Sequence, residues 1–122
     1  MQGKRLVRVN QLIKEEISMV VQRQLKDPRL GFVTVTEVDT TPDLKHAKVF
    51  VSVLGPDAQW AASFKALESA RGFVWSWLRR HLDLRVTPEI TFRPDRSMEH
   101  AAHLQSLLAD LKKAEAASES EE

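Results

Sequence analysis

Apolar residues recur at spacings of three and four along residues 4–25, which is the pattern of an amphipathic helix. The stripe consists of Leu6, Val9, Leu12, Ile13, Ile17, Val20, Val21 and Leu25. Asp27-Pro28 follows the stripe, and the residue before a proline is disfavoured in helical geometry. The pattern therefore predicts a first helix that buries one face and ends before Pro28.

Two segments in which apolar β-branched residues alternate with polar ones follow the helix. They cover residues 32–38 and 46–54, and the turn-forming segment 39–44 lies between them. A period of two over such residues is typical of strands. The short connection predicts that the two strands pair antiparallel.

The helical period returns over residues 57–82, with a glycine inside the run. Because glycine is unfavourable in a helix interior, we expect two helices joined by a kink at residues 69–72. Residues 89–92 then form a short predicted strand. About 30 residues separate the second and third strands, which is long enough for a crossover to a parallel strand.

The last apolar stripe predicts a C-terminal helix that starts near Ser97. Residues 114–122 contain four Glu, no Lys or Arg and no apolar residue larger than alanine, so we expect an acidic, disordered tail. The order of elements is α-β-β-α-α-β-α. It predicts one α+β domain over residues 1–113, with a three-stranded mixed sheet packed on one side by helices.

Length and composition limit the class of protein further. The chain has 122 residues, which suits one domain. It contains no cysteine, which excludes a disulfide framework and thiolate catalysis. No apolar run approaches the ~20 residues that span a membrane, and the N-terminal segment does not resemble a secretory signal. We therefore expect a cytoplasmic protein that does not bind membranes.

The charge of the chain is unevenly distributed. The net charge is only +1, but residues 1–30 carry seven Lys or Arg against three Asp or Glu, and residues 71–96 carry six against three. If the two basic zones fold onto one face, that face would attract a polyanion. Ordinary solvated surface charge would give the same counts, so charge alone leaves both interpretations open.

Signals of enzyme chemistry are weak. The four glycines are scattered, so there is no glycine-rich phosphate loop, and there is no nucleophile elbow. His100 and His103, beside Glu99, could place two imidazoles near one metal ion, but no third ligand is evident. Turn formation explains Asp43 more simply than acid–base catalysis does. The sequence predicts no enzyme, no metal site and no cofactor.

One row of side chains suits an RNA partner. Arg71, Trp75 and Arg79 are spaced by four residues, so they lie on one face of the second helix of the kinked pair. Arginine contacts phosphate, and tryptophan can stack on a base. Packing of Trp75 at the edge of the core explains its position equally well. Trp60 and Trp77 are predicted to be core residues.

Two blocks of sequence together carry a resemblance to a known family. The first block comprises Asp27-Pro28-Arg29-Leu30-Gly31, Val33-Thr34-Val35-Thr36 and residues 43–55. The second comprises Ala70-Arg71-Gly72-Phe73-Val74, Leu84-Arg85 and Pro88-Glu89-Ile90-Thr91-Phe92. In their combination, order and spacing, these blocks resemble the ribosome-binding factor A family over about residues 5–111.

The resemblance implies a type II KH-like fold, in which the kink Ala70-Arg71-Gly72 replaces the usual glycine loop. It also implies a protein that binds the free 30S small ribosomal subunit and the 5′ region of 16S rRNA, and that assists late 30S maturation and 16S rRNA processing. Further implications are a role in cold growth, release by a ribosome-assembly GTPase, and a monomeric, cytoplasmic, non-enzymatic protein. The chain departs from the family pattern at Trp75, where a basic residue is common.

Charge and resemblance together give the main hypothesis, an RNA-binding assembly factor. The residues expected to contact phosphate are Arg5, Arg8, Arg29, Lys45, Arg71, Arg79, Arg80 and Arg85. The kink Ala70-Arg71-Gly72 is expected to let the RNA backbone approach closely. The alternative is a protein-interaction module whose basic face docks on an acidic protein.

Overall fold

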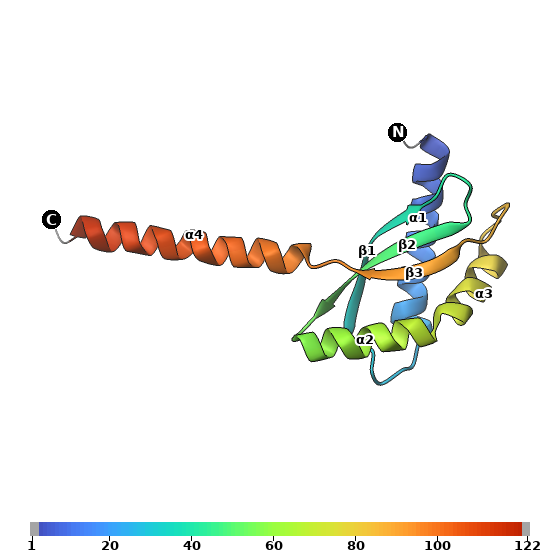
Figure 1. Ribbon diagram of the computed structural model, residues 1–122, viewed down its shortest axis with the longest axis horizontal. Coiled ribbons are helices and arrows are strands. Elements are labelled where there is room, and N and C mark those ends of the chain that lie inside the picture. The colour runs from blue at the N-terminus through green and yellow to red at the C-terminus, as the bar shows by residue number, and fades with distance from the viewer. Residues whose placement is uncertain (1–2, 121–122) are drawn as a thin grey trace.

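The structure, a computed structural model, describes residues 3–120. It consists of a packed α+β body and one long helix that projects from it (Figure 1). The elements in chain order are α1 (Lys4–Met19), the π-helical turn η1 (Val20–Gln24), β1 (Phe32–Thr40), β2 (His46–Leu54), α2 (Asp57–Ser69), α3 (Arg71–His81), β3 (Glu89–Pro94) and α4 (Ser97–Ser120).

The three strands form one sheet in the order β1-β2-β3. β1 and β2 pair antiparallel, and β2 and β3 pair parallel. The predictions of an antiparallel first pair and of a crossover through the two kinked helices are therefore confirmed. A β-bulge between Val35 and Glu37 adds one residue to β1. Because of this extra residue, Val33, Val35 and Val38 all lie on the buried face.

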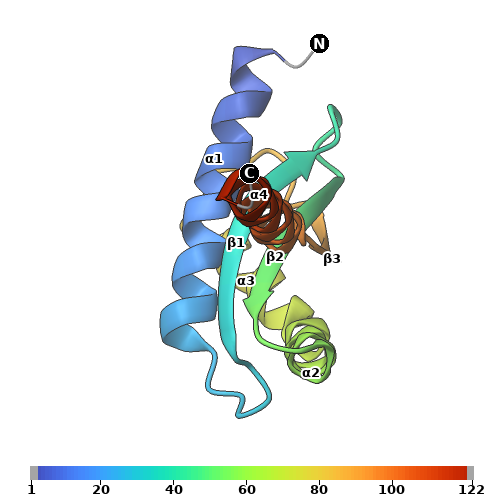
Figure 2. The ribbon, with the colours of Figure 1, turned by 90° about the vertical axis from the view of Figure 1, so that its left-hand side faces the viewer.

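The helices cover that face of the sheet. Along each strand, buried and more exposed residues alternate, with the bulge as the one interruption. The strands lie in front of α1 in Figure 1, and Figure 2 shows α1 running alongside β1. The core combines Val9, Ile13, Ile17 and Val20 with Val35, Val49, Val51, Leu67, Val74, Leu78, Ile90 and Phe92. The predicted class, an α+β domain with a mixed sheet packed on one side by helices, is confirmed.

Two tryptophans fix α2 and α3 to the rest of the body. Trp60 is 3% exposed, and its Nε1–H donates to the carbonyl of Gly55 at 3.2 Å. Trp77 is partly buried against the core, and its Nε1–H donates to Glu16 Oε2 at 2.9 Å. The predicted core position is confirmed for Trp60, whereas Trp77 lies at the core edge and connects α3 to α1.

The junction between α2 and α3 is a single residue. Ala70, with φ −90° and ψ −2°, ends one helix and precedes the next, so the predicted kink is confirmed. The loop before β1 packs beside this pair of helices. The Gly31 N–H donates to Ser63 Oγ at 3.1 Å, and a Cβ at Gly31 would collide with the side chain of Gln59. A larger residue at position 31 would therefore have to displace the flexible end of the Gln59 side chain.

The ends of three elements differ slightly from the sequence prediction. The first helix changes to π-helical geometry from Val20, and Leu25 N–H bonds to the Val20 carbonyl at 3.0 Å. β1 extends to Thr40, whose N–H donates to Asn10 Oδ1 at 2.9 Å. β3 extends to Pro94.

α4 corrects the prediction for the C-terminal segment. The predicted disorder of residues 114–122 is wrong over residues 114–120, which are helical, and residues 121–122 lie outside the described part. The prediction considered only the lack of apolar residues to bury. From Ser97 onward, however, the chain contains no Gly or Pro and many Ala, Leu, Lys and Glu, which are good helix formers.

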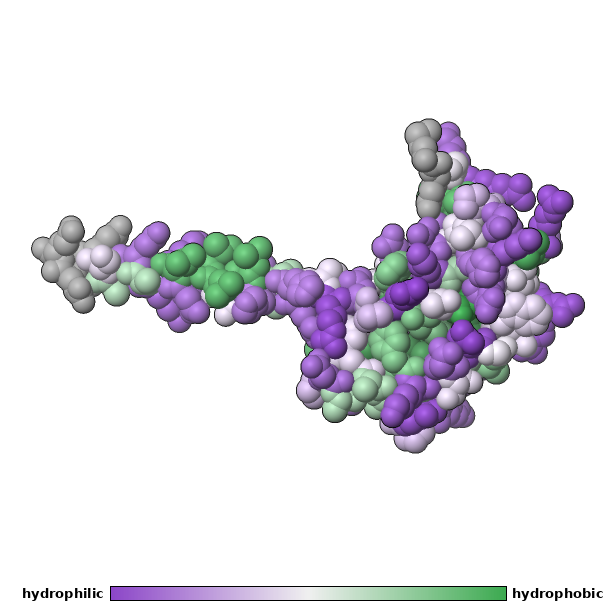
Figure 3. All heavy atoms as spheres, in the orientation of Figure 1, coloured by the Kyte–Doolittle hydropathy of each residue, from purple (hydrophilic) through white to green (hydrophobic). Residues whose placement is uncertain are grey.

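The large apolar side chains of α4 are exposed. Met98, Leu104, Leu107, Leu108 and Leu111 are each at least 47% exposed. Figure 3 shows an apolar patch on this helix, well away from the body. The packed unit therefore ends at the start of α4, before the domain boundary predicted at residue 113.

Two residues between β3 and α4 anchor the base of this helix. The Asp95 N–H donates to the Val51 carbonyl at 2.8 Å, and Asp95 Oδ2 accepts a hydrogen bond from Thr36 Oγ1 at 2.6 Å. The Arg96 guanidinium lies 4.0 Å from the ring centroid of Trp60 and forms an ion pair with Asp57 at 3.1 Å. These contacts join the base of α4 to the sheet and to α2.

Candidate nucleic-acid interface

One end of the body contains a cleft of about 850 Å³. It lies between the start of α1, the β1–β2 turn and the loop between α3 and β3. Arg5, Lys45 and Arg85, three of the residues predicted to contact phosphate, line this cleft together with Lys48. We call this site, with these four cations on it, the basic cleft.

The cations of the basic cleft are available to a ligand. Within the described residues, none of the four forms an ion pair. Two carboxylates, Asp39 and Asp43, also line the cleft, which leaves an excess of two positive charges. Asp39 is the cross-strand partner of Lys48 and partly balances it. Arg5, Lys45 and Arg85 therefore provide most of the attraction for an anion.

Asp43 shapes the turn rather than acting on a ligand. Its Oδ1 accepts hydrogen bonds from Thr41 Oγ1 at 2.6 Å and from the Lys45 N–H at 3.0 Å. The Thr41 hydrogen bond, followed by that of Lys45, lowers the pKa of Asp43 below its usual value. The carboxylate stays ionised and holds the β1–β2 turn in place.

A second group of predicted residues lies at the kink. Arg29 Nη2 is 2.6 Å from Asp27 Oδ2, and Arg29 Nε is 3.0 Å from Asp27 Oδ1. These side-chain hydrogen bonds from Arg29 lower the pKa of Asp27 to about 2. Arg29 Nη2 also reaches Ser69 Oγ at 3.3 Å, next to the junction residue Ala70. This geometry gives Arg29 a local structural partner that the sequence prediction did not foresee.

The kink itself presents an open surface. Arg71 forms an ion pair with Glu68, with Nε 3.2 Å from Oε1, so its charge is partly balanced. At Gly72, an added Cβ would meet no atom within 4 Å. Packing within the described chain therefore does not explain the glycine, and its surface is free for a partner to approach.

Trp75, in the row of side chains along α3, was predicted either to stack on a base or to pack at the core edge. Trp75 is 37% exposed, and its Nε1–H donates to the Thr87 carbonyl at 3.3 Å, so Trp75 lies at the core edge. The guanidinium carbon of Arg79 is 5.5 Å from the ring centroid. Arg80 Nε donates to the Ser76 carbonyl at 3.3 Å. Stacking of Trp75 on a base stays a prediction.

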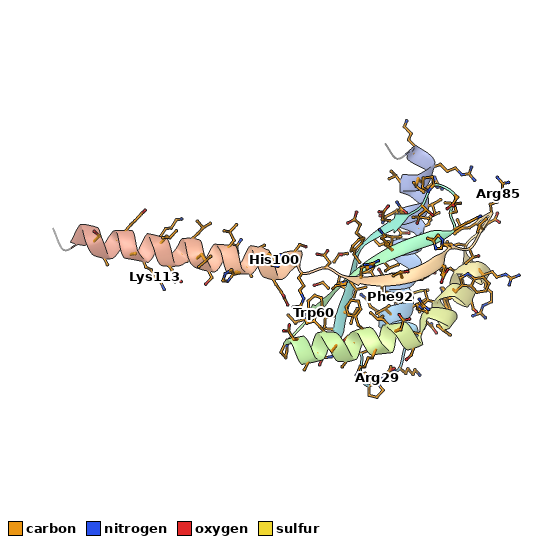
Figure 4. The ribbon with its side chains drawn as sticks, viewed as in Figure 1. Arg29, Trp60, Arg85, Phe92, His100 and Lys113 are labelled. Atoms are coloured by element: carbon orange, nitrogen blue, oxygen red, sulfur yellow. The ribbon has the colours of Figure 1, made fainter. Side chains whose placement is uncertain are left out.

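The predicted residues thus form two groups at different ends of the body. Figure 4 shows Arg29 below α2 and Arg85 in the loop beyond α3. α3 begins at the kink and ends at the loop that carries Arg85, so Arg79 and Arg80 lie along the connection. Arg8 is exposed on α1, one turn beyond Arg5.

Lys48 is the cleft residue that sequence reasoning missed. It stands at a polar position of β2, two residues after His46. The alternation of the strand and the proximity of Lys45 in the sequence were the signals that could have identified it.

Metal ligands and membrane-spanning helices would point to other classes of function. Residues 3–120 contain no cluster of three or more His, Cys, Asp or Glu side chains that could hold a metal ion. His100 and His103 are exposed on α4. No helix in the described part is both long and apolar enough to cross a membrane.

Known proteins share both the sequence and the fold. The family model of ribosome-binding factor A matches residues 5–108. Ribosome-binding factor A of Desulfitobacterium hafniense is 47% identical over 114 residues, which cover 93% of this chain and 91% of that protein. The protein of the same name from Thermomicrobium roseum is 45% identical over 107 residues, covering 88% and 83%.

Solved structures of relatives match the body. The crystal structure of ribosome-binding factor A from Thermus thermophilus has a TM-score of 0.66 and 25% identity, over 76% of this chain and 97% of that chain. A homology model of the Thermus thermophilus protein, fitted into a cryo-EM map of its 30S complex, has a TM-score of 0.60 and 26% identity, over 71% and 91%.

Topology and surface define a class: a small KH-like α+β domain that presents unpaired cations at one end. The likeness to solved structures and the match over residues 5–108 narrow that class to one family. The chain belongs to the ribosome-binding factor A family. The resemblance inferred from the two sequence blocks is confirmed.

Proposed function

We propose that this protein binds the free 30S subunit through 16S rRNA, assists late 30S maturation and promotes 16S rRNA processing without catalysing a reaction. The observation that carries the proposal is the basic cleft, where Arg5, Lys45 and Arg85 converge without ion-pair partners among the described residues. Unpaired cations on one surface are the electrostatic feature that phosphate backbones recognise. The Thermus thermophilus relative fitted into a 30S complex supports the same partner.

Roles within the predicted set follow from the contacts. Arg5, Lys45 and Arg85 provide the main phosphate contacts. Three more predicted cations, on α1 and α3, extend this surface: Arg8, Arg79 and Arg80. Arg29 and Arg71, which are paired with carboxylates, position the loop and the kink around Ala70 and Gly72, where RNA approaches the backbone.

Further elements of the proposal come from the family alone. They are contact with the 5′ region of 16S rRNA, a role in cold growth, release by a ribosome-assembly GTPase, a cytoplasmic location and a monomeric state. The full chain also carries the acidic segment 114–122, which repels RNA and so favours contact through the body.

Sedimentation of lysate through a density gradient tests the partner. We expect the protein to migrate with free small subunits and to be absent from whole ribosomes. Arg5→Glu and Arg85→Glu are expected to reduce this association, whereas Lys65→Glu, on exposed α2 surface outside the cleft, serves as the matched control. Equal association of all three variants would contradict the proposal.

Docking on an acidic protein is the second candidate. Its support is the same excess of positive charge, since a carboxylate cluster also satisfies unpaired arginines. Ribonuclease treatment before a pulldown separates the two functions. Loss of the partners after treatment supports RNA binding, and survival of all partners supports protein docking.

A further inference from the structure

We infer that the basic cleft is a pocket for one unpaired nucleotide, with the base inside and the 5′-phosphate on the cationic rim. The inference rests on the proposed function for its RNA source, but the pocket is argued from its own geometry. Its volume of about 850 Å³ falls within the range of small-molecule sites, ~300–1,000 Å³. A cleft of this size accepts a base and ribose, which a flat basic patch does not.

The lining of the cleft matches the two halves of a nucleotide. Leu6, Pro42, Leu44 and Val86 provide apolar surface against which a base can pack. Arg5, Lys45, Lys48 and Arg85 provide the charge for a phosphate group. Inorganic phosphate alone would use the cations and leave the apolar wall exposed to water.

A buried hydroxyl gives the cleft an unused polar group. Thr40 also lines the cleft, and it is only 1% exposed. Its Oγ1 is the one buried side-chain polar atom in the described part of the chain that has no hydrogen-bond partner. Buried polar atoms in native proteins nearly always have partners, so a base in the cleft would satisfy this hydroxyl once the Thr40 side chain turns toward it. A base offers both donors and acceptors for this hydroxyl.

The turn that closes the cleft is held in an unusual conformation. Leu44 has φ 62°, and it is the only non-glycine residue in the described part with a positive φ. The left-handed region is unfavourable for leucine, so surrounding contacts must maintain it. Leu44 N–H bonds to the Thr41 carbonyl, and Thr41 N–H to the His46 carbonyl, both at 2.8 Å. The wall formed by Leu44 is therefore in place before a ligand arrives.

The shape of the site favours an unpaired residue over a duplex. In an A-form helix the bases are stacked and paired, and their faces are unavailable to a concave pocket. A base that is unstacked or flipped out can enter such a pocket and pack on its walls. The same chemistry belongs to a free nucleoside 5′-monophosphate and to a single-stranded residue of RNA, so the test must distinguish these sources.

The first experiment is a titration of the full chain, labelled with ¹⁵N, with each of the four nucleoside 5′-monophosphates and, separately, with inorganic phosphate. We expect the nucleotides to shift the amide signals of Leu6 and Thr40, which line the cleft next to its apolar wall, together with those of Lys45 and Arg85, and inorganic phosphate to shift mainly the signals of Lys45 and Arg85. Equal shifts with phosphate alone, or no shifts in the cleft with any nucleotide, would overturn the inference.

Thr40→Val tests the hydroxyl, with Thr91→Val on the exposed face of β3 as the matched control. We expect Thr40→Val to weaken nucleotide binding about fivefold, because one hydrogen bond is lost. The same change removes an unsatisfied polar atom, so the melting temperature should stay equal or rise, which excludes unfolding as the cause. Unchanged nucleotide affinity in Thr40→Val would contradict the role of the hydroxyl and the inferred pose.

A short unstructured RNA and the purified small subunit then identify the source. If Thr40→Val weakens binding of nucleotide, RNA and subunit alike, the occupant is an RNA residue. If only nucleotide binding weakens, the occupant is a free nucleotide, and the link to RNA is wrong. If the pocket inference is wrong but the proposed function is right, nucleotides cause no shifts in the cleft, and Arg5→Glu and Arg85→Glu still reduce association with subunits. If the proposed function is wrong but the pocket exists, the protein does not associate with subunits, and nucleotides still shift the cleft signals.

Discussion

Asp27 and Arg29 form a surface ion pair in which the charge of the arginine is balanced by a carboxylate two residues away. Asp27 also accepts a hydrogen bond from the Arg29 backbone N–H at 2.9 Å, so side chain and main chain of one residue hold the same carboxylate. The contact closes the loop that packs on α2 through Gly31. Arg29, although it lies on a candidate binding surface, therefore fixes the conformation of that surface before it contacts any ligand.

Asp27→Asn should destabilise the fold in a pH-dependent way. The Arg29 hydrogen bonds lower the pKa of Asp27 in the folded state from 3.8 to about 2. Stability from this group is therefore present above pH 3.8 and is lost as the pH falls through about 2. Urea unfolding at pH 7 should show a less stable variant, and the difference from wild type should disappear near pH 2. A difference that persists unchanged at pH 2 would assign the effect to something other than the carboxylate, and Asp110→Asn on α4 is the control.

Gly72→Ala should separate stability from binding. Alanine is favoured over glycine in a helix by roughly 0.5–1 kcal/mol, and the added Cβ meets open space. Thermal unfolding should therefore show equal or higher stability. Under the proposed function, the methyl group obstructs the approach of RNA, so association with small subunits should fall. A variant that is more stable and binds equally well would show that RNA does not approach the kink.

Among the elements, α2 and α4 differ in the source of their stability. Leu67 of α2 is fully buried, whereas Leu108 of α4 is 51% exposed. A helix made of residues with high helix propensity can form without packing against other elements, but its hydrogen bonds alone give it only marginal stability. The body and α4 should therefore respond differently to the same substitution.

Leu67→Ala should destabilise the body by about 2–5 kcal/mol, the usual cost of a buried leucine. Leu108→Ala should change the free energy of unfolding by no more than about 0.5 kcal/mol, because it removes no buried contact. Urea unfolding followed by tryptophan fluorescence measures both, since Trp60, Trp75 and Trp77 all lie in the body. Comparable losses in the two variants would mean that α4 packs on the body in solution.

Periodicity predicted the elements whose faces are buried. β2 was predicted with its observed bounds, and the kink was predicted from Gly72 although the junction residue is Ala70. The apolar stripe also predicted the start of α4 near Ser97, which is confirmed, but it did not predict that the helix continues over residues 114–120, where helix propensity and internal hydrogen bonds rather than burial maintain it. The tail prediction used burial as its only criterion and was wrong for that reason.

The candidate site was less predictable than the fold. Charge counts identified Arg5, Lys45 and Arg85, but not that they share a cleft, because contacts between residues 40 and 80 positions apart depend on the sheet. The pairing of Arg29 with Asp27 and the positive φ of Leu44 depend on backbone geometry in two turns. No spacing rule applied to the sequence alone reports such geometry.

At the scale of the whole molecule, binding to small subunits should depend on salt. Released counterions give a slope of about 0.7 in log affinity against log salt for each phosphate contact on single-stranded RNA. Arg85→Ala and Arg5→Ala should each lower that slope by about 0.7. Binding measured by filter retention over a series of salt concentrations gives the slope directly. A flat titration of the wild-type protein would contradict phosphate recognition.

The anchored base of α4 has a consequence for how the molecule moves in solution. A helix of 24 residues is about 36 Å long at 1.5 Å per residue, and it extends along the longest axis of the molecule (Figure 1). An elongated particle meets more friction than a compact one of equal mass. A monomer would therefore elute early from a gel-filtration column and could be mistaken for a dimer. Sedimentation equilibrium, which reports mass independently of shape, is the measurement that counts its subunits.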